Sequence, residues 1–177
     1  VLVEHQAEIF DHHHPSPFML HVYGIRPKWR ERLCAVNHVD NIVNKLRKQN
    51  LNGVNITIPF KESIIQYLDK INPRAQSIGA ANCIINSDSM IIGNNTDWYG
   101  FSMMLKINDI NLTDKEVIVL GAGGSAKSIL YSLRKIGVEK ILLINRSIEK
   151  AKALQDNYVI ANSMDDAENI IKTEKNM

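Results

Sequence analysis

The apolar positions of the chain recur at two different periods. Between residues 39 and 46 they return every three or four positions, which predicts a helix with Asp40 as its N-cap. Apolar and polar residues then alternate over 54–58, which predicts a strand that Pro59 closes. The further elements expected are a helix over 61–68, a short helix over 73–78, strands over 81–86 and 90–93 joined by a turn at 87–89, and a helix after Asp97. Residues 1–36 show no clear period.

The second half of the chain has a simpler order of strands and helices. Residues 116–120 (EVIVL) are almost continuously apolar, which is typical of a strand in a parallel sheet covered on both faces. The elements expected after it are a glycine-rich turn, a helix over 125–136 that Gly137 ends, a strand over 140–145 and a helix capped by Ser147. This βαβ order predicts an α/β fold, with one unit over residues 1–107 and a partial Rossmann-type unit over 108–177.

Composition and charge exclude several classes of protein. The 177 residues are 45% hydrophobic and 23% charged, as in an ordinary globular protein, and the net charge of +2 gives no case for a nucleic-acid partner. No apolar run reaches the ~18 residues of a membrane span, and no secretory signal is visible. Neither the two cysteines nor the histidine run 12–14 has metal-ligand spacing, so we expect a reduced, cytoplasmic protein without a metal. Because the chain starts at Val1 and stops in a polar, helix-like stretch, we expect a piece of a longer protein.

The glycine-rich turn has the pattern of a dinucleotide site. Gly121-x-Gly123-x-x-Ala126 fits G-x-G-x-x-G/A, and it lies after a predicted strand and opens a predicted helix. The first glycine permits a tight turn, the second lets the backbone approach a pyrophosphate, and the helix N-terminus offers free N–H groups to the phosphates. The alternative is a turn that serves packing only.

The end of the next predicted strand indicates which dinucleotide is bound. An NAD site places Asp or Glu there to bind the ribose 2′-hydroxyl, whereas this chain has Asn145-Arg146-Ser147 and then Lys150. A guanidinium, a hydroxyl and an ammonium suit a 2′-phosphate, so we predict NADP as the cofactor. Alternatively, Arg146 is a solvated loop residue and Ser147 is only a helix cap.

Polar residues also cluster at the edges of the predicted elements upstream. Asn55 and Thr57 share one face of their predicted strand, and Lys61, Asn82 and Asp97 lie at strand or loop edges. Together these groups can bind a small polyhydroxylated acid, and a Lys–Asp pair can relay a proton to or from a substrate oxygen. Each residue also has a structural interpretation: an ordinary strand residue, a solvated helix start, a turn former or an N-cap.

Five motifs, in this order, resemble the shikimate dehydrogenase family: GVNITIPFK, GAANC, NNTD, GAGGSA and NRS, with similarity throughout residues 50–155. The resemblance implies NADPH-dependent reduction of 3-dehydroshikimate to shikimate, a step of chorismate and aromatic amino-acid biosynthesis. It implies that Lys61 is the catalytic acid/base and that Asp97 binds a substrate hydroxyl and polarises the lysine. The other implied site residues are Ser16, Thr57 and Asn82 for the substrate, and Gly121, Ala122, Gly123, Gly124, Ser125, Asn145, Arg146, Ser147 and Lys150 for NADP.

The sequence departs from this family at several points, which leaves alternatives open. A histidine, His14, replaces one serine of the family's carboxylate-binding motif and leaves Ser16, Cys83 replaces a usual threonine, and the family continues well beyond Met177. One alternative is therefore a truncated, non-catalytic chain, whose half sheet leaves apolar faces that favour aggregation or assembly, such as a homodimer. The other is a relative that acts on quinate or a similar cyclic acid.

Overall fold

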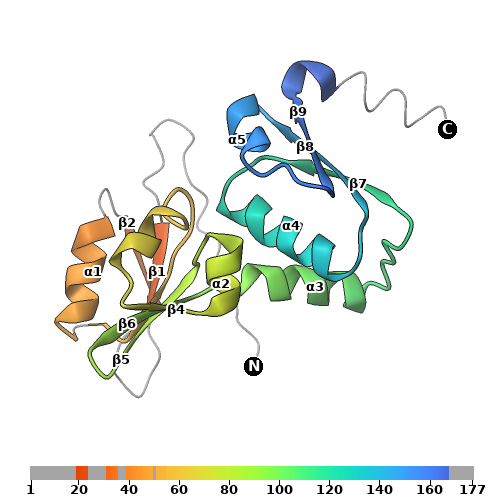
Figure 1. Ribbon diagram of the computed structural model, residues 1–177. Helices are drawn as coiled ribbons and strands as arrows, with labels where there is room; N and C mark the ends of the chain where they lie inside the picture. The colour runs from red at the N-terminus through yellow and green to blue at the C-terminus, as the bar shows by residue number, and fades with distance from the viewer. Residues whose placement is uncertain (1–18, 24–30, 36–38, 50, 168–177) are drawn as a thin grey trace, which may run out of the picture.

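The computed structural model describes residues 19–23, 31–35, 39–49 and 51–167, and within them the strands form two sheets (Figure 1). The first sheet has the order β2-β1-β3-β5-β6-β4, and the second has the order β7-β8-β9. We call the part built on the first sheet, residues 19–94, the first lobe, and the part built on the second sheet, residues 116–167, the second lobe. Helix α3 (Asp97–Ile107) runs between them and packs beside helix α4 (Gly124–Lys135) of the second lobe.

The first lobe is a mixed sheet that packs against helices. Its strands are β1 (Met19–Tyr23), β2 (Glu31–Ala35), β3 (Gly53–Asn55), β4 (Lys70–Ile71), β5 (Cys83–Ser87) and β6 (Met90–Asn94). Its helices are α1 (Val39–Arg47), the short 3-10 helix η1 (Ser63–Tyr67) and α2 (Pro73–Ile78). The apolar face of α1 packs on the sheet through side chains such as Leu46, which is fully buried beside Val54 and Ile84. The short helix at 73–78 and the hairpin of β5 and β6 are confirmed.

Three predictions for the first lobe were wrong. Helix α1 already begins at Val39, so Asp40 lies in its first turn and is not its N-cap. The predicted strand 54–58 ends at Asn55, and the backbone N–H of Ile56 instead donates to the carbonyl of Asn82. The helix expected over 61–68 is a turn followed by η1. Strands β1 and β2 lie in segments for which no element was predicted, because the sequence shows no clear period there.

The second lobe is a parallel sheet with helical crossovers. Strands β7 (Glu116–Leu120), β8 (Lys140–Asn145) and β9 (Val159–Ser163) pair in parallel, and they alternate with α4 and α5 (Ile148–Lys152). The βαβ order and the strand bounds 116–120 and 140–145 are confirmed, and α4 begins one residue before the predicted start. Ser147 precedes α5 as predicted, but its hydroxyl donates to the Glu149 carboxylate and accepts no bond from the backbone N–H groups of the helix.

The prediction that β7 is covered on both faces was wrong for the described residues. Two successive right-handed crossovers in one direction place α4 and α5 on the same face of the sheet, where Val119 and Leu143 are buried. On the opposite face Leu120 is 70% exposed and Ile160 is 45% exposed. On the same face Leu142 and Ile144 of the central strand β8 are buried, so among the described residues the exposed apolar side chains of this face lie on the outer strands. Among the described residues, no helix combines the length and the apolar character needed to cross a membrane.

Candidate functional site

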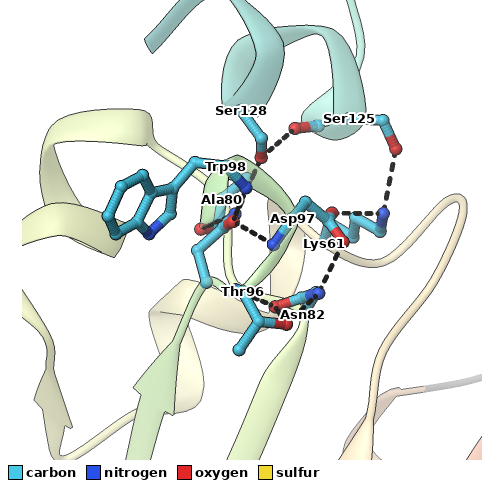
Figure 2. Close-up of polar contacts among 10 residues, drawn as sticks. Lys61, Ala80, Asn82, Thr96, Asp97, Trp98, Ser125 and Ser128 are labelled. Atoms are coloured by element: carbon cyan, nitrogen blue, oxygen red, sulfur yellow. Dashed lines mark hydrogen bonds and ion pairs between the residues drawn. The ribbon is translucent and has the colours of Figure 1, made fainter. Parts of the chain in front are cut away.

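Lys61 lies where the two lobes meet. The turn between β3 and η1 carries it, and its backbone carbonyl accepts a hydrogen bond of 2.8 Å from the N–H of Ala81. The residue is only 9% exposed. Its ammonium donates to the Asp97 carboxylate, Nζ to Oδ2, at 2.7 Å and to the Ser125 hydroxyl of α4 at 2.9 Å (Figure 2). Lys61 is therefore held by both lobes and is not a solvated helix start.

Asp97 connects this lysine to Asn82. Its Oδ1 accepts a hydrogen bond of 2.7 Å from the Asn82 side chain, while its Oδ2 accepts from Lys61. Asn82 also donates to the Thr96 hydroxyl at 3.0 Å and accepts from the Thr96 N–H at 2.8 Å. Asp97 is the first residue of α3, and Thr96 holds the N-cap position. The structural interpretation of Asp97 as an N-cap is therefore wrong, since its carboxylate bonds to side chains.

One substrate residue implied by the resemblance, Thr57, lies outside this cluster. Thr57 lies in an exposed turn after β3, and it is not part of the hydrogen-bond cluster around Lys61. Because β3 ends at Asn55, the argument that Asn55 and Thr57 share a strand face does not hold. Ser16, together with the histidine run 12–14, lies outside the described residues.

A buried polar contact joins the lobes behind this cluster. Asn95 is 1% exposed, and its side-chain NH₂ donates to the carbonyl of Ala80 at 3.0 Å and to the hydroxyl of Ser128 in α4 at 2.9 Å. Its Oδ1 accepts from the N–H of Asp97 at 3.1 Å, so the same amide also supports the start of α3. The Ser132 hydroxyl of α4 donates to the carbonyl of Trp98 at 2.7 Å. No local pattern in the sequence predicts this contact, because it depends on which face of α4 meets the first lobe.

A pocket of about 390 Å³ lies on the second lobe beside the cluster. Its lining contains six of the nine residues implied for the cofactor: Ala122, Gly123, Asn145, Arg146, Ser147 and Lys150. Glu62, Lys127, Ala153 and Leu154 complete the lining. The fold thus brings the glycine turn and the segment after β8 to one cavity, as expected at the carboxyl edge of a parallel sheet.

The three remaining cofactor residues lie at the edge of the glycine turn, outside this lining. Gly121 has a φ of +99°, a conformation that side chains disfavour, so a glycine is needed for the turn itself. Gly124 packs against Lys61, since a Cβ on Gly124 would lie 2.8 Å from the Lys61 Cβ. Ser125 directs its hydroxyl to Lys61.

The pocket has the space and the charge that a dinucleotide phosphate needs. A Cβ built on Gly123 would meet no atom within 4 Å, so the backbone at the start of α4 faces open space. The free N–H groups of a helix N-terminus bind anions there, and Arg146 and Lys150 add positive charge. Lys127 also lines the pocket but is paired with Glu62 of the first lobe, Nζ to Oε2, at 2.5 Å. Neither residue of this pair was singled out by the sequence analysis.

Two further observations concern side-chain chemistry. Burial raises the pKa of the Cys83 thiol, which favours its protonated, unreactive form next to Asn82. Within the described ranges no group of three His, Cys, Asp or Glu side chains lies close enough to hold a metal ion.

Comparison with known proteins agrees with this arrangement. The family model "Shikimate dehydrogenase substrate binding domain" matches residues 19–84, and the model "Shikimate / quinate 5-dehydrogenase" matches residues 102–175. The chain belongs to the shikimate dehydrogenase family. A relative from Pelagibacter ubique, named shikimate dehydrogenase (NADP(+)), is 37% identical over 136 residues, which are 77% of this chain and 51% of the relative.

Solved structures of family members share the fold. Shikimate dehydrogenase 1 from Peptoclostridium difficile is 32% identical with a TM-score of 0.70, over 75% of this chain and 49% of that one. Quinate dehydrogenase from Corynebacterium glutamicum, in complex with NAD, is 26% identical with a TM-score of 0.67, over 76% of this chain and 51% of that one. The α/β fold with a Rossmann-type part is confirmed. The chain spans about half the length of the shikimate dehydrogenase relatives that it matches.

Proposed function

We propose that this chain acts as part of an NADP-dependent shikimate dehydrogenase, which reversibly reduces 3-dehydroshikimate to shikimate. The observation that carries the proposal is the Lys61–Asp97 pair, at 2.7 Å, beside a cationic pocket at a glycine turn. Residues 1–107 then form the substrate-binding domain, and residues 108–177 form part of the dinucleotide-binding domain. A cytoplasmic location, homodimer formation and the absence of nucleic-acid and membrane partners remain predictions of the sequence.

Lys61 is the proposed acid/base. An ammonium has three N–H donors, and Asp97 and Ser125 accept from it in this structure, which leaves a donor for a substrate oxygen. NADPH, when bound, supplies the hydride that reduces the ketone carbon. Lys61 gives a proton to the carbonyl oxygen as that oxygen gains negative charge, and in the reverse direction the neutral amine takes the hydroxyl proton. The Asp97 carboxylate orients the lysine and balances its positive charge.

Asn82, Thr57 and Ser16 are the remaining proposed substrate contacts. The Asn82 amide already bonds to Asp97 and Thr96, so it must exchange one of these bonds to bind a substrate hydroxyl directly. Its present contacts support a role in orienting Asp97. In the second lobe, the glycine turn from Gly121 to Gly124, just before Ser125, is proposed to surround the pyrophosphate, and Asn145, Arg146, Ser147 and Lys150 to bind the 2′-phosphate.

The test is NADP⁺ reduction with shikimate as substrate, measured on this 177-residue chain and on a version extended to the length of its relatives. Lys61→Ala should lower kcat by about 10²- to 10⁴-fold while the dissociation constant of NADP⁺ stays unchanged. Lys45→Ala, on the exposed side of α1, is the matched control and should keep full turnover. Undiminished turnover in Lys61→Ala would refute the assignment.

The same assay tests the two alternatives. Faster turnover with quinate than with shikimate, or with NAD⁺ than with NADP⁺, would favour a relative like the Corynebacterium glutamicum enzyme. Activity in the extended version alone would mean that the catalytic groups need the rest of the enzyme. The absence of turnover in both versions, together with weak NADP⁺ binding, would favour the non-catalytic alternative.

A further inference from the structure

The hydroxyl of Ser125 contacts Lys61 across the boundary between the lobes. Ser125 lies in the first turn of α4, within the glycine-rich segment of the second lobe, whereas Lys61 belongs to the first lobe. The Lys61 Nζ donates to the Ser125 Oγ at 2.9 Å, close to the 2.7 Å of its bond to Asp97 (Figure 2). The resemblance to the family implies a cofactor contact for Ser125, but its hydroxyl is directed at the lysine and the residue does not line the pocket.

Contacts on either side of Ser125 hold its backbone against the first lobe. The neighbouring Gly124 lies so close to Lys61 that a Cβ on it would be 2.8 Å from the lysine Cβ. One turn further along α4, Ser128 is bonded to the buried Asn95 at 2.9 Å. The start of α4 is thus held against the first lobe on both sides of Ser125. A hydroxyl on a backbone held in this way loses little entropy when it binds the ammonium.

We propose that Ser125 is a positioning residue for Lys61, an inference that rests on the proposed acid/base function of that lysine. Asp97 and Ser125 fix two of the three ammonium donors, which sets the rotation of the group and directs the third donor toward the substrate. Because Ser125 belongs to the second lobe, Lys61 is fully oriented only while the two lobes are in contact. Docking of the nucleotide-binding part thereby orders the proton donor of the other part.

The first test measures the lysine itself and needs no turnover. In the 177-residue chain with ¹⁵N-labelled lysine, an ammonium gives a sharp NMR signal only when hydrogen bonds and burial slow its exchange with water, and Lys61→Arg identifies the Lys61 signal. Ser125→Ala should broaden this signal strongly, and Ser125→Thr, which keeps the hydroxyl, should restore it. Ser77→Ala removes a helix hydroxyl that donates to the carbonyl of Pro73, away from Lys61, and should have no effect. An unchanged Lys61 signal in Ser125→Ala would overturn the proposal.

The second test separates positioning from cofactor binding in the version extended to family length. Ser125→Ala should lower kcat by about 3- to 10-fold, the loss expected for one hydrogen bond, with an unchanged dissociation constant for NADP⁺. A raised dissociation constant with unchanged kcat would instead make Ser125 a cofactor contact and overturn the inference. If no version turns over, the proposed function fails, and the NMR result still decides whether Ser125 holds Lys61.

Discussion

Adding one methyl group at Gly124 tests whether the two lobes meet as the structure describes. The Cβ of an alanine there would lie 2.8 Å from the Lys61 Cβ and 3.4 Å from the Ala80 Cβ. Carbon atoms prefer separations of about 3.5–4.0 Å, so α4 and the Lys61 turn must move apart by roughly 0.7–1.2 Å. The Lys61 Cβ is bonded directly to the Cα, so rotation about the side-chain bonds cannot move it away.

The magnitude of the Gly124→Ala effect follows from two opposing terms. Overpacking of this kind costs about 1–3 kcal/mol, while alanine in place of glycine in a helix contributes about 0.5–1 kcal/mol of stability. We therefore expect a net loss of up to about 2 kcal/mol, which is a Tm lower by several degrees for a chain of this length. The effect on turnover is larger, because a shift near 1 Å at a catalytic group can cost about 10²-fold in rate.

Gly123→Ala is the matched control, one residue earlier. A Cβ there meets no atom within 4 Å, and its φ of −92° is open to any residue, so the Tm should not change. Its methyl group projects into the pocket, so NADP⁺ affinity should fall at least 10-fold, on the order of one lost close contact with the phosphates. Thermal unfolding and NADP⁺ titration of both variants test the contact at Gly124 and the pocket at Gly123. An unchanged or raised Tm together with full turnover in Gly124→Ala would refute the described contact with Lys61, and unchanged NADP⁺ affinity in Gly123→Ala would refute the pocket assignment.

Two further predictions concern charged pairs. Hydrogen bonds from the Arg47 guanidinium and then from a backbone N–H hold the pKa of Asp69 below its ordinary value of 3.8. The ionised carboxylate therefore stabilises the fold at pH values above 3.8, and this stabilisation is lost as the pH falls through the lowered pKa. In urea unfolding, Asp69→Asn should therefore be less stable than the parent chain at pH 7, and the gap should close in acid; a gap independent of pH would contradict this. Glu62→Gln should strengthen NADP⁺ binding several-fold, because it removes a carboxylate from the pocket and frees Lys127, with little change in stability for so exposed a pair. Weaker NADP⁺ binding by Glu62→Gln in a titration would contradict this explanation.

Where several local signals agree, the sequence was enough to predict the helix or strand. Helix α2 begins with Pro73 after Asn72, whose side chain accepts from the N–H of Arg74, and it ends at Gly79 with a φ of +71°. Each of these signals lies within a few residues of the element it bounds. The continuous apolar run of β7 is of the same kind.

The predictions failed where a distant backbone partner decided the local structure. The alternation at 54–58 is that of a strand, yet the N–H of Ile56 turns to the carbonyl of Asn82, and Ile58 is left 64% exposed. Period alone cannot reveal such a partner. The extent of the expected strand was wrong for this reason.

The candidate site likewise contains residues that the sequence could identify and contacts that it could not. Ordered motifs singled out Lys61, Asn82 and Asp97, and the structure brings these three into one hydrogen-bond cluster, although their roles stay predictions. The contacts of Ser125 with Lys61 and of Lys127 with Glu62 depend on how α4 docks across the lobes. No pattern within one segment carries that information.

The buried Asn95 contact between the lobes has a consequence for how a ligand as large as a dinucleotide enters. Asn95 bonds to both Ala80 of the first lobe and Ser128 of α4, and Ser132 of α4 bonds to the carbonyl of Trp98 in α3. As the lobes part, water can replace each bond at a net cost of only about 0.5–1.5 kcal/mol, and neither apolar core has to open. A junction joined by such hydrogen bonds is therefore expected to open at a lower free-energy cost than one joined by a shared apolar core.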